Sequence, residues 1–361
     1  MKKCGILLTV LSIIAAVVFS GCLETIDQKI IYEGLQDAPV DSNDPDYQDY
    51  INNIFKYQEL YTMTINGLNI QRLTNNKFYE SQADVSPDGT KIVMSIHYKP
   101  EGSMTGIEPG WEIAVMDKDG LNITNLTNND WLDTGAHWNH DGTKIVYLSD
   151  TAHRTIEQLN SENYTPIQLD IYTMNLDGSE PTQITFANPG EIYSDPSFSF
   201  GLPSKILYVY DSDGQPPQNY DLYMMDADGC NKTLILNHDH PELQAIAIND
   251  PMFSPDGTTI IFEAEMGKDQ WNHSIYHIFT VDTLGNNLVK MTKDDQVSEG
   301  MAQFSPTGAW ITFDRVIWNS AIDGTRNIWL SDSNGSKEQC LSSFRYEGCA
   351  SWFPPAELVS R

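Results

Sequence analysis

The sequence predicts an all-β protein: a six-bladed β-propeller made of four-stranded antiparallel blades. Three observations support this prediction. Two short sequence phrases alternate along the 361-residue chain. Each phrase joins two apolar strands by a tight turn, and no helical periodicity of useful length interrupts them. One copy of each phrase together spans roughly forty residues, the length of a four-stranded propeller blade.

The first phrase consists of a small residue, a variable residue, an aromatic residue or Val, then Ser-Pro-Asp-Gly or a related turn, and an apolar strand. The Asp-Gly pair is typical of a tight turn, because positive φ costs Gly nothing and Asp little. This phrase therefore predicts the first two strands of each blade. Its copies lie at residues 83–94, 136–147, 196–208, 251–262, 302–313 and 350–355, the last of which is shortened.

The second phrase consists of an apolar strand, a turn that carries Gly, and a strand that ends near Leu-Thr. Its turns read Asn-Gly, Asp-Gly or Leu-Gly, which again favour a hairpin. We expect this phrase to supply the third and fourth strands of each blade. Its copies lie at residues 60–74, 112–127, 170–185, 221–236, 276–292 and 327–342.

The two ends of the repeat array complement each other. The last copy of the first phrase, at 350–355, supplies an innermost strand without a full second strand, and the unit at 60–74 lacks an innermost strand. Residues 28–32 (Gln-Lys-Ile-Ile-Tyr) match 143–147 (Thr-Lys-Ile-Val-Tyr), which is a second strand. We therefore expect residues from both ends to pair in one blade, which removes the open sheet edges. The alternative is that residues 29–32 are only a linker.

Both phrases resemble the TolB-type propeller repeat, a WD40-like repeat, over about residues 29–355. The resemblance implies a six-bladed propeller of the kind found in the periplasmic TolB protein and its relatives. The chain departs from full-length TolB because it lacks the separate α/β domain that precedes that propeller. A Tol–Pal role is therefore not implied.

The N-terminus is typical of an exported lipoprotein. Lys2 and Lys3 precede an apolar run at residues 6–19, which is short for a membrane span and fits a signal peptide. The run ends in Ser-Gly before Cys22, which resembles the lipobox of bacterial lipoproteins, where the Cys is diacylated and becomes the first residue. Phe19 stands where Leu is usual. The alternatives are an ordinary signal peptide or an uncleaved anchor.

From these features we expect three segments. They are a lipoprotein signal peptide at residues 1–21, a short tether at 22–28 and the propeller at 29–361. The protein is then exported and anchored by lipid to the cell envelope, on its periplasmic or extracellular face.

The charge of the chain narrows the classes of partner. There are 50 Asp and Glu against 21 Lys and Arg, a formal net charge of −29. Nucleic-acid binding and electrostatic attachment to anionic lipids both depend on Lys and Arg, so this charge argues against them. We expect a monomeric propeller whose partner is an envelope protein or glycan, and which contacts the membrane through its N-terminal lipid only.

Three cysteines lie in the predicted propeller. An exported protein can keep a disulfide, and Cys340 and Cys349 are close enough in sequence to close a small loop at the seam of the ring. A Cys340–Cys349 bridge is one interpretation. The other is that these residues and Cys230 are small buried hydrophobic residues.

The strand order divides the propeller into two faces. The first-to-second and third-to-fourth turns share one face, which we call the turn face. The second-to-third loops and the blade-to-blade loops share the other, which we call the loop face. The longest loops, at residues 35–59, 99–111 and 151–169, lie on the loop face. Because rigid scaffolds carry function on such loops, we predict the loop face as the working face.

Acidic and aromatic residues recur where the predicted loops meet the innermost strands. If the carboxylates converge around the channel mouth, they attract a cation or raise each other's pKa. The alternative is that they cap backbone N–H groups of the neighbouring blade. Exposed aromatic residues among carboxylates suit sugar rings or peptide side chains. The candidate binding rim comprises Glu80, Asp133, Asp195, Asp250, Glu299, Glu347, Trp111 and Trp131, together with His137 and Gln303.

The variable column of the first phrase suggests a rival function. If its side chains face the channel, His137 and Gln303 carry the groups that suit a transition metal. The oligogalacturonate lyases are propeller enzymes that use His and Gln to hold a divalent metal, which implies a metal-dependent polysaccharide lyase with Mn or Ca as the alternative. The column reads Asp84, His137, Ser197, Met252, Gln303 and Ser351.

Nothing in the sequence favours nucleophilic chemistry. It contains no Gly-x-Ser-x-Gly elbow, no glycine-rich phosphate loop and no His-Glu-x-x-His motif. We therefore assign no catalytic residue and expect no cofactor. The expected function is a non-catalytic module that binds or scaffolds a protein or glycan at the cell envelope.

Overall fold

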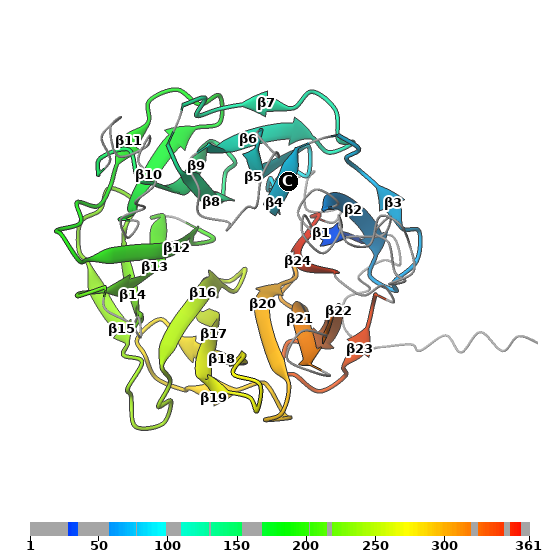
Figure 1. The fold of residues 1–361 in the computed structure, drawn as a ribbon, viewed down its shortest axis with the longest axis vertical. Helices are drawn as coiled ribbons and strands as arrows, with labels where there is room; N and C mark the ends of the chain where they lie inside the picture. The colour runs from blue at the N-terminus through cyan, green and yellow to red at the C-terminus, as the bar shows by residue number, and fades with distance from the viewer. Residues whose placement is uncertain are drawn as a thin grey trace, which may run out of the picture.

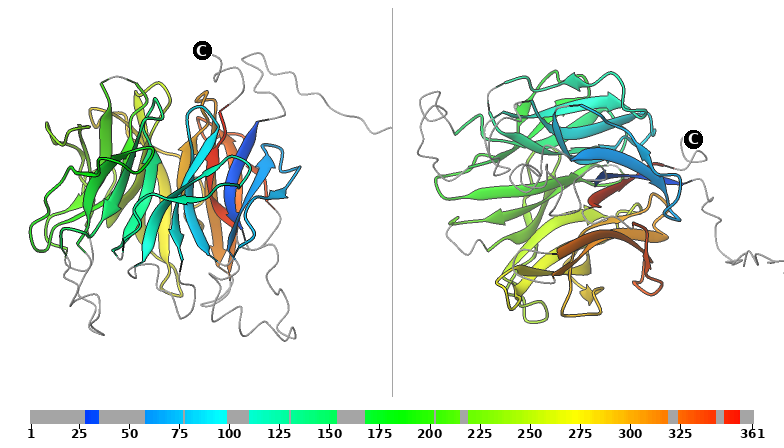
Figure 2. Two further views of the ribbon diagram at one scale, coloured as in Figure 1. Left: turned by 90° about the horizontal axis from the view of Figure 1, so that it is seen from above. Right: turned by 45° about the vertical axis from the view of Figure 1, so that its right-hand side comes forward.

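The computed structural model describes residues 28–34, 58–76, 78–98, 110–129, 131–153, 168–201, 203–214, 219–318, 324–342 and 347–354. Six four-stranded antiparallel sheets stand around a central channel like the blades of a propeller (Figure 1). In side view their strands run between the two faces of the ring (Figure 2). The prediction of an all-β, six-bladed propeller is confirmed. In the described part of the chain, no helix is long and apolar enough to span a membrane.

Blades 2 to 6 each consist of four consecutive strands, which follow one another from the channel outward. Blade 2 contains β4 (Tyr79–Val85), β5 (Lys91–His97), β6 (Trp111–Asp117) and β7 (Thr124–Asn125). Blade 3 contains β8 (Asp133–Trp138), β9 (Lys144–Ser149), β10 (Asp170–Asn175) and β11 (Thr182–Gln183). Blade 4 contains β12 (Ile192–Phe198), β13 (Lys205–Asp211), β14 (Asp221–Asp226) and β15 (Thr233–Leu236).

The middle strands of the next two blades are longer. Blade 5 contains β16 (Ala247–Phe253), β17 (Thr259–Lys268), β18 (Ser274–Asp282) and β19 (Val289–Lys290). Blade 6 contains β20 (Ser298–Phe304), β21 (Trp310–Trp318), β22 (Gly324–Asp332) and β23 (Gln339–Cys340). The additional residues extend both β17–β18 and β21–β22 toward the loop face.

Blade 1 closes the ring with strands from both ends of the chain. From the channel outward it contains β24 (Glu347–Trp352), β1 (Lys29–Gly34), β2 (Glu59–Thr64) and β3 (Gln71–Arg72). In β24 and β1, Trp352 lies opposite Ile30 and Ser351 opposite Ile31. The predicted pairing of the two ends in one blade is confirmed.

The Ser-Pro-Asp-Gly turn is held by its own side chains. Ser86 Oγ donates to Asp88 Oδ1 at 2.6 Å and accepts the backbone N–H of Lys91 at 2.9 Å. Gly89 has φ 67°, a left-handed conformation that Gly adopts freely. The same contacts recur at residues 254–259. The acid of each such turn therefore serves the hairpin.

The Thr that ends each Leu-Thr strand is also structural. Thr74 Oγ1 accepts the backbone N–H of Leu60 at 2.9 Å and so joins the end of the fourth strand to the third. The bond recurs in four further blades, from Ile113 to Thr127 (3.0 Å), Ile171 to Thr185 (2.8 Å), Ile278 to Thr292 (2.8 Å) and Ile328 to Ser342 (2.9 Å).

The hydrophobic core is divided among the contacts between neighbouring blades. One cluster joins Leu207 and Val209 of blade 4 to Phe253 and Phe262 of blade 5. Another joins blades 6 and 1 across the seam. Because each sheet packs face to face against the next, most strand residues are buried on both sides. The ring is therefore a rigid frame around the channel.

Candidate functional site

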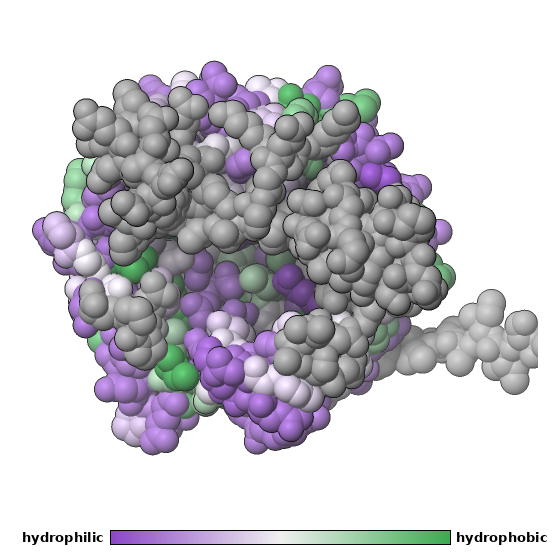
Figure 3. Space-filling view, viewed as in Figure 1, coloured by the Kyte–Doolittle hydropathy of each residue, from purple (hydrophilic) through white to green (hydrophobic). Residues whose placement is uncertain are grey.

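The channel is the candidate functional site. The innermost strands that surround it repeat from blade to blade, whereas the side chains that they direct into it differ. The structure places the variable column along its wall. Figure 3 views the loop face, where the centre of the ring is hollowed and lined by hydrophilic and some apolar residues. The lining residues of the column are Asp84, His137, Ser197, Met252, Gln303 and Ser351.

A β-bulge in every innermost strand aims these side chains. In β4 the pairing with β5 slips between Ser81 and Asp84, and Gln82 within the slip has φ 53°. A bulge bends the strand and redirects the side chains beside it. The equivalent left-handed residues are Gly135 (66°), Asp195 (48°), Asp250 (47°), Met301 (51°) and Cys349 (51°).

The bulge also bonds blades 1, 2, 3 and 6 to the blade before each of them. The backbone N–H of Met301 donates to Glu263 Oε2 at 2.9 Å, and that of Cys349 donates to Asp314 Oδ2 at 3.0 Å. Gly135 donates in the same way to Ser95 Oγ at 3.1 Å. The acceptors Ser95, Glu263 and Asp314, with Glu33 opposite Gln82, all occupy the fifth position of a second strand. In blades 1, 2, 5 and 6 this polar residue thus satisfies an N–H that the bulge leaves open, whereas blades 3 and 4 carry Leu148 and Val209 at the same position.

Asp195 compensates for a blade that breaks this pattern. In blade 4 the fifth position of the second strand is Val209, which cannot accept a hydrogen bond. Asp195 Oδ2 instead accepts the backbone N–H of Asp250 at 3.1 Å, and Ser194 donates to its other oxygen at 2.8 Å. Asp195 therefore positions the bulge of blade 5 as well as lining the channel.

Three buried carboxyl groups gather on this side of the channel. Burial raises the pKa of Asp195. Burial, reinforced by the carboxylates of Asp195 and Glu263, raises the pKa of Asp250 well above its usual range. Burial raises the pKa of Glu263 to about 7. Burial and mutual repulsion thus favour the protonated forms of these carboxyls.

The opposite wall is organised by Asp84. Its Oδ2 accepts the backbone N–H of Trp138 at 3.2 Å and lies 3.3 Å from His137 Nδ1, and its Oδ1 accepts from Ser351 Oγ at 3.0 Å. One carboxylate therefore joins the innermost strands of blades 1, 2 and 3. In the sequence, Asp84 belongs to the variable column but not to the candidate rim.

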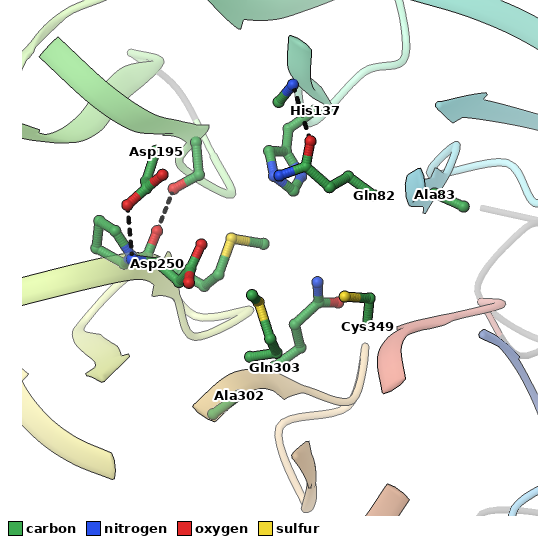
Figure 4. Close-up of a pocket in the computed structure, with 13 residues that line it drawn as sticks. Gln82, Ala83, His137, Asp195, Asp250, Ala302, Gln303 and Cys349 are labelled. Atoms are coloured by element: carbon green, nitrogen blue, oxygen red, sulfur yellow. Dashed lines mark hydrogen bonds between the residues drawn. The ribbon is translucent and has the colours of Figure 1, made fainter. Parts of the chain in front are cut away.

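His137 and Gln303, the candidate metal ligands, lie on different walls. Figure 4 shows Asp195 and Asp250 side by side, whereas His137 and Gln303 enter from opposite sides. Their strands, β8 and β20, are three blades apart in the ring. Among the described residues, no group of three or more His, Cys, Asp or Glu side chains is placed to hold one metal ion.

Toward the turn face the channel widens into a cavity of about 440 Å³. The repeated phrase itself forms the wall, with the aromatic residue before each turn and the Pro within it. From the sequence we expect these turns to have only a structural role. The recurrence of an aromatic residue and a Pro at fixed spacing is nevertheless a pattern that could have indicated a cavity at the turn-face end of the channel. The wall includes Trp138, Phe198, Phe253, Phe304, Trp352, Pro87, Pro255, Pro306 and Pro354.

Glu80, Asp133 and Glu299 lie away from the channel cavities and are at most 3% exposed. Thr74 donates to Glu80 at 2.9 Å and Asn129 to Asp133 at 2.7 Å. Burial raises the pKa of Glu80 to about 7 and that of Asp133 to about 6. The predicted ring of carboxylates at the channel mouth is therefore corrected, because these three side chains bind donors within and between the blades.

Glu299 has a cation as its partner. Arg315 Nε donates to Glu299 Oε1 at 2.6 Å. The guanidinium of Arg315 also donates to Glu338 at 2.6 Å and lies 4.0 Å from the centre of the Trp329 ring. Arg315 therefore ties the start of β20 to the outer part of its own blade.

The two candidate tryptophans differ in their surroundings. Trp111 is 4% exposed and packs edge-on against Tyr79, 5.0 Å between ring centres, so its assignment to the binding rim is corrected. Trp131 is half-buried on the loop face, where Asn129 accepts its backbone N–H at 2.7 Å. The side chain of Glu347 and the predicted acylation site Cys22 lie outside the described residues.

The proposed disulfide is also corrected. Cys340 and Cys349 form no disulfide with each other. Cys340 lies on the outermost strand of blade 6, and Cys349 lies on the innermost strand of blade 1 beside Arg326, with Sγ 3.2 Å from Nη2. Three strand spacings of about 4.8 Å separate the outer from the inner edge of a blade, which exceeds the reach of a disulfide.

Comparisons with solved structures agree with this architecture. TolB from Acinetobacter baumannii superposes with a TM-score of 0.63 at 13% identity, over 91% of this chain and 67% of that one. A structure designated TolB from Agrobacterium tumefaciens gives 0.54 at 14% identity, over 91% and 99%. Hydrazine synthase from Kuenenia stuttgartiensis gives 0.62 at 12% identity, over 90% and 46%. No family model matches the chain. These likenesses show a shared TolB-like propeller fold.

Proposed function

We propose that this chain is an exported, lipid-anchored propeller that binds a protein or glycan of the cell envelope without catalysing a reaction. The observation that supports this function is the contrast within the channel. The frame residues repeat from blade to blade, whereas the residues that face the channel differ in charge, size and polarity. Such a wall offers a distinct set of donors, acceptors and apolar contacts to one partner.

The covalent geometry of the tether supports an orientation on the membrane. Lys29 pairs with Thr64, from which the third-to-fourth turn on the turn face begins. The chain therefore enters β1 from the turn face. The seven residue-to-residue steps from Cys22 to Lys29 span at most about 25 Å. A lipid on Cys22 holds the turn face near the membrane and leaves the loop face open to partners.

A photo-crosslinking amino acid at Gln303 tests the channel as the binding site. We expect adducts with one envelope component in intact cells, and loss of these adducts with the additional substitution His137→Ala. The matched control places the crosslinker at Val289, which is 50% exposed on the outermost strand β19. Equal adducts from both positions, or none from Gln303, would contradict the proposal. Turnover of polygalacturonate by the purified protein with Mn²⁺ would contradict its non-catalytic part.

Labelling with an alkyne-tagged fatty acid tests the anchor. We expect Cys22→Ala to abolish incorporation and release the protein from membranes. Cys230→Ala serves as the control, because Cys230 is an exposed free thiol on the propeller. Label that persists in the Cys22→Ala variant would show that another residue carries the lipid.

A further inference from the structure

A second concave site lies on the loop side between blades 5 and 6. It is a groove of about 380 Å³ that shares Met301 with the lining of the channel. Its walls come from the extended strand pairs β17–β18 and β21–β22, with Tyr276, Val316 and Trp318 as the larger apolar surfaces. The buried residues Glu263 and Asp314 and the partly exposed Arg326 also line it. The groove therefore combines an aromatic wall with a polar floor.

The aromatic wall is held in place before any ligand arrives. The ring of Trp318 stacks on that of His273, with centres 3.8 Å apart and planes inclined by 19°. Asp269 fixes His273, because its carboxylate accepts the backbone N–H at 2.9 Å and lies 2.9 Å from Nδ1. The contact joins the hairpins of blades 5 and 6. A wall that is already ordered loses little conformational entropy on binding.

The floor presents an acceptor that the described residues leave without a partner. Asp314 Oδ2 accepts from Arg326 Nε at 2.8 Å, from Arg326 Nη2 and from the backbone N–H of Cys349. Asp314 Oδ1 has no hydrogen bond, although the residue is only 2% exposed. A buried carboxylate oxygen without a donor is costly, and ligand-binding sites are one place where such atoms occur.

Arg326 offers a donor beside this acceptor. Its side chain is 33% exposed and lines the groove. Its hydrogen bonds to Asp314 and Cys349 use Nε and Nη2, and among the described residues no hydrogen bond uses Nη1. Burial raises the pKa of Asp314, and the guanidinium of Arg326 opposes that rise. Because Asp314 compensates the charge of Arg326 and Glu263 adds a further carboxyl, the floor has no surplus positive charge and favours a neutral ligand over an anionic one.

These features define the chemistry of the ligand. A hydroxyl group both donates and accepts, so two adjacent hydroxyls match an acceptor and a donor that lie side by side. A pyranose ring carries such hydroxyls at its edge and C–H groups on its face, and the C–H face packs on an indole ring. We propose that the groove binds one sugar ring of a neutral glycan, with its hydroxyls at Asp314 and Arg326 and its face on Trp318.

Saturation-transfer NMR on the purified full chain tests this site with named probes. Glucose, galactose and N-acetylglucosamine are the neutral probes; glucosamine and glucuronate are their charged counterparts. We expect at least one neutral sugar to bind, with Trp318→Ala weakening it about tenfold, the equivalent of roughly 1.4 kcal/mol. Asp314→Asn keeps an acceptor for Arg326 and Cys349 but replaces Oδ1 by a donor, and we expect it to weaken binding similarly.

Three matched variants separate this site from the fold and from the channel. Trp318→Phe keeps an aromatic wall and should retain binding within about threefold. Phe186→Ala removes an exposed aromatic ring away from the groove, and His137→Ala alters only the channel; both should bind as the parent does. No neutral sugar binding, preference for a charged sugar, or unchanged binding in Trp318→Ala and Asp314→Asn would each overturn the groove proposal. Because the channel is tested by crosslinking, either proposal can fail alone.

Discussion

At the scale of single residues, the acidic side chains have several different structural roles. Asp256 belongs to a hairpin turn, where the hydroxyl of Ser254 and the backbone N–H of Thr258 lower its pKa. Glu80 is fully buried near a blade connection, and Asp195 lines the channel while it serves a backbone donor. A formal charge of −29 therefore says little about where a ligand binds, because many of the acidic side chains accept hydrogen bonds from backbone and side-chain donors of the protein itself.

The pH dependence of stability tests the burial of Glu80. Burial, with a smaller contribution from Glu59, raises its pKa from 4.5 to about 7. The folded state thus binds the proton more tightly than the unfolded state. The stabilising effect of that proton is complete below pH 4.5 and is lost as the pH rises through 7. The stability of Glu80→Gln relative to the parent should therefore be greater at pH 8 than at pH 5, by on the order of 2 kcal/mol.

Urea unfolding of Glu80→Gln and of the parent at both pH values measures this difference. The exposed residue Glu242 provides the control Glu242→Gln, for which we expect no such change between the two conditions. A Glu80→Gln effect that is identical at pH 5 and pH 8 would show that the carboxyl is ionised throughout.

Substitutions of the left-handed bulge residue of blade 3 measure the cost of an unfavourable backbone conformation separately from the cost of steric overlap. Gly135 has φ 66°, and a Cβ there would lie 3.7 Å from Leu148 Cδ1, an ordinary contact. A β-branched residue is strained at this φ, so Gly135→Val should cost about 2 kcal/mol. Gly135→Asn should cost less than about 1 kcal/mol, because Asn tolerates the conformation. Denaturant midpoints of the two variants give the comparison, and equal losses would argue against a backbone origin.

At the scale of elements, hairpins follow from local sequence but contacts between blades do not. The Asp-Gly and Asn-Gly turns identify the strands, since the turn residues act within a few positions of each other. A polar residue recurs at the fifth position of the second strand in four blades, yet it contacts a bulge tens of residues later in the chain. Glu33 and Gln82, for example, are 49 residues apart. Its role is visible only once the neighbouring blade is in place.

A double-mutant cycle tests this contact between blades 5 and 6. A Cβ on Gly300 would lie 1.7 Å from Glu263 Oε2, so Gly300→Ala must displace the carboxylate that accepts the Met301 N–H. We expect Gly300→Ala to cost about 2–3 kcal/mol in the parent chain. In the Glu263→Ala background the same substitution should cost much less. Additive losses in the cycle would show that the two residues do not interact.

At the scale of the whole molecule, stability depends on closing the ring at blade 1. Its innermost strand β24 is separated in sequence from β1 by almost the entire propeller. Asp84 also stabilises this closure on the channel side, because it accepts a hydrogen bond from Ser351, which is 267 residues away in the sequence. Pairing with β24 covers the inner edge of β1, which favours one compact state over open forms.

Truncation tests the closure. Removal of residues 347–361 deletes β24 and should abolish cooperative unfolding and expose the edge of β1 to aggregation. Removal of residues 355–361 keeps all of β24 and serves as the control. Thermal unfolding followed by circular dichroism, with size-exclusion chromatography, distinguishes the two variants. A cooperative, monomeric protein that lacks residues 347–361 would show that β24 is not needed to close the ring.

The sequence by itself determined the number of blades, the turns within them and the strand exchange at blade 1. Hairpin turns and alternating apolar residues act over a few positions, so their pattern can be read directly from the chain. Only the tertiary structure decided that Glu80, Asp133 and Glu299 are buried, that Cys340 and Cys349 lie at opposite edges of blades, and that Trp318 meets Arg326 in a groove. These outcomes depend on which donor, charge or ring a distant blade places beside each side chain, and no local pattern encodes that neighbour.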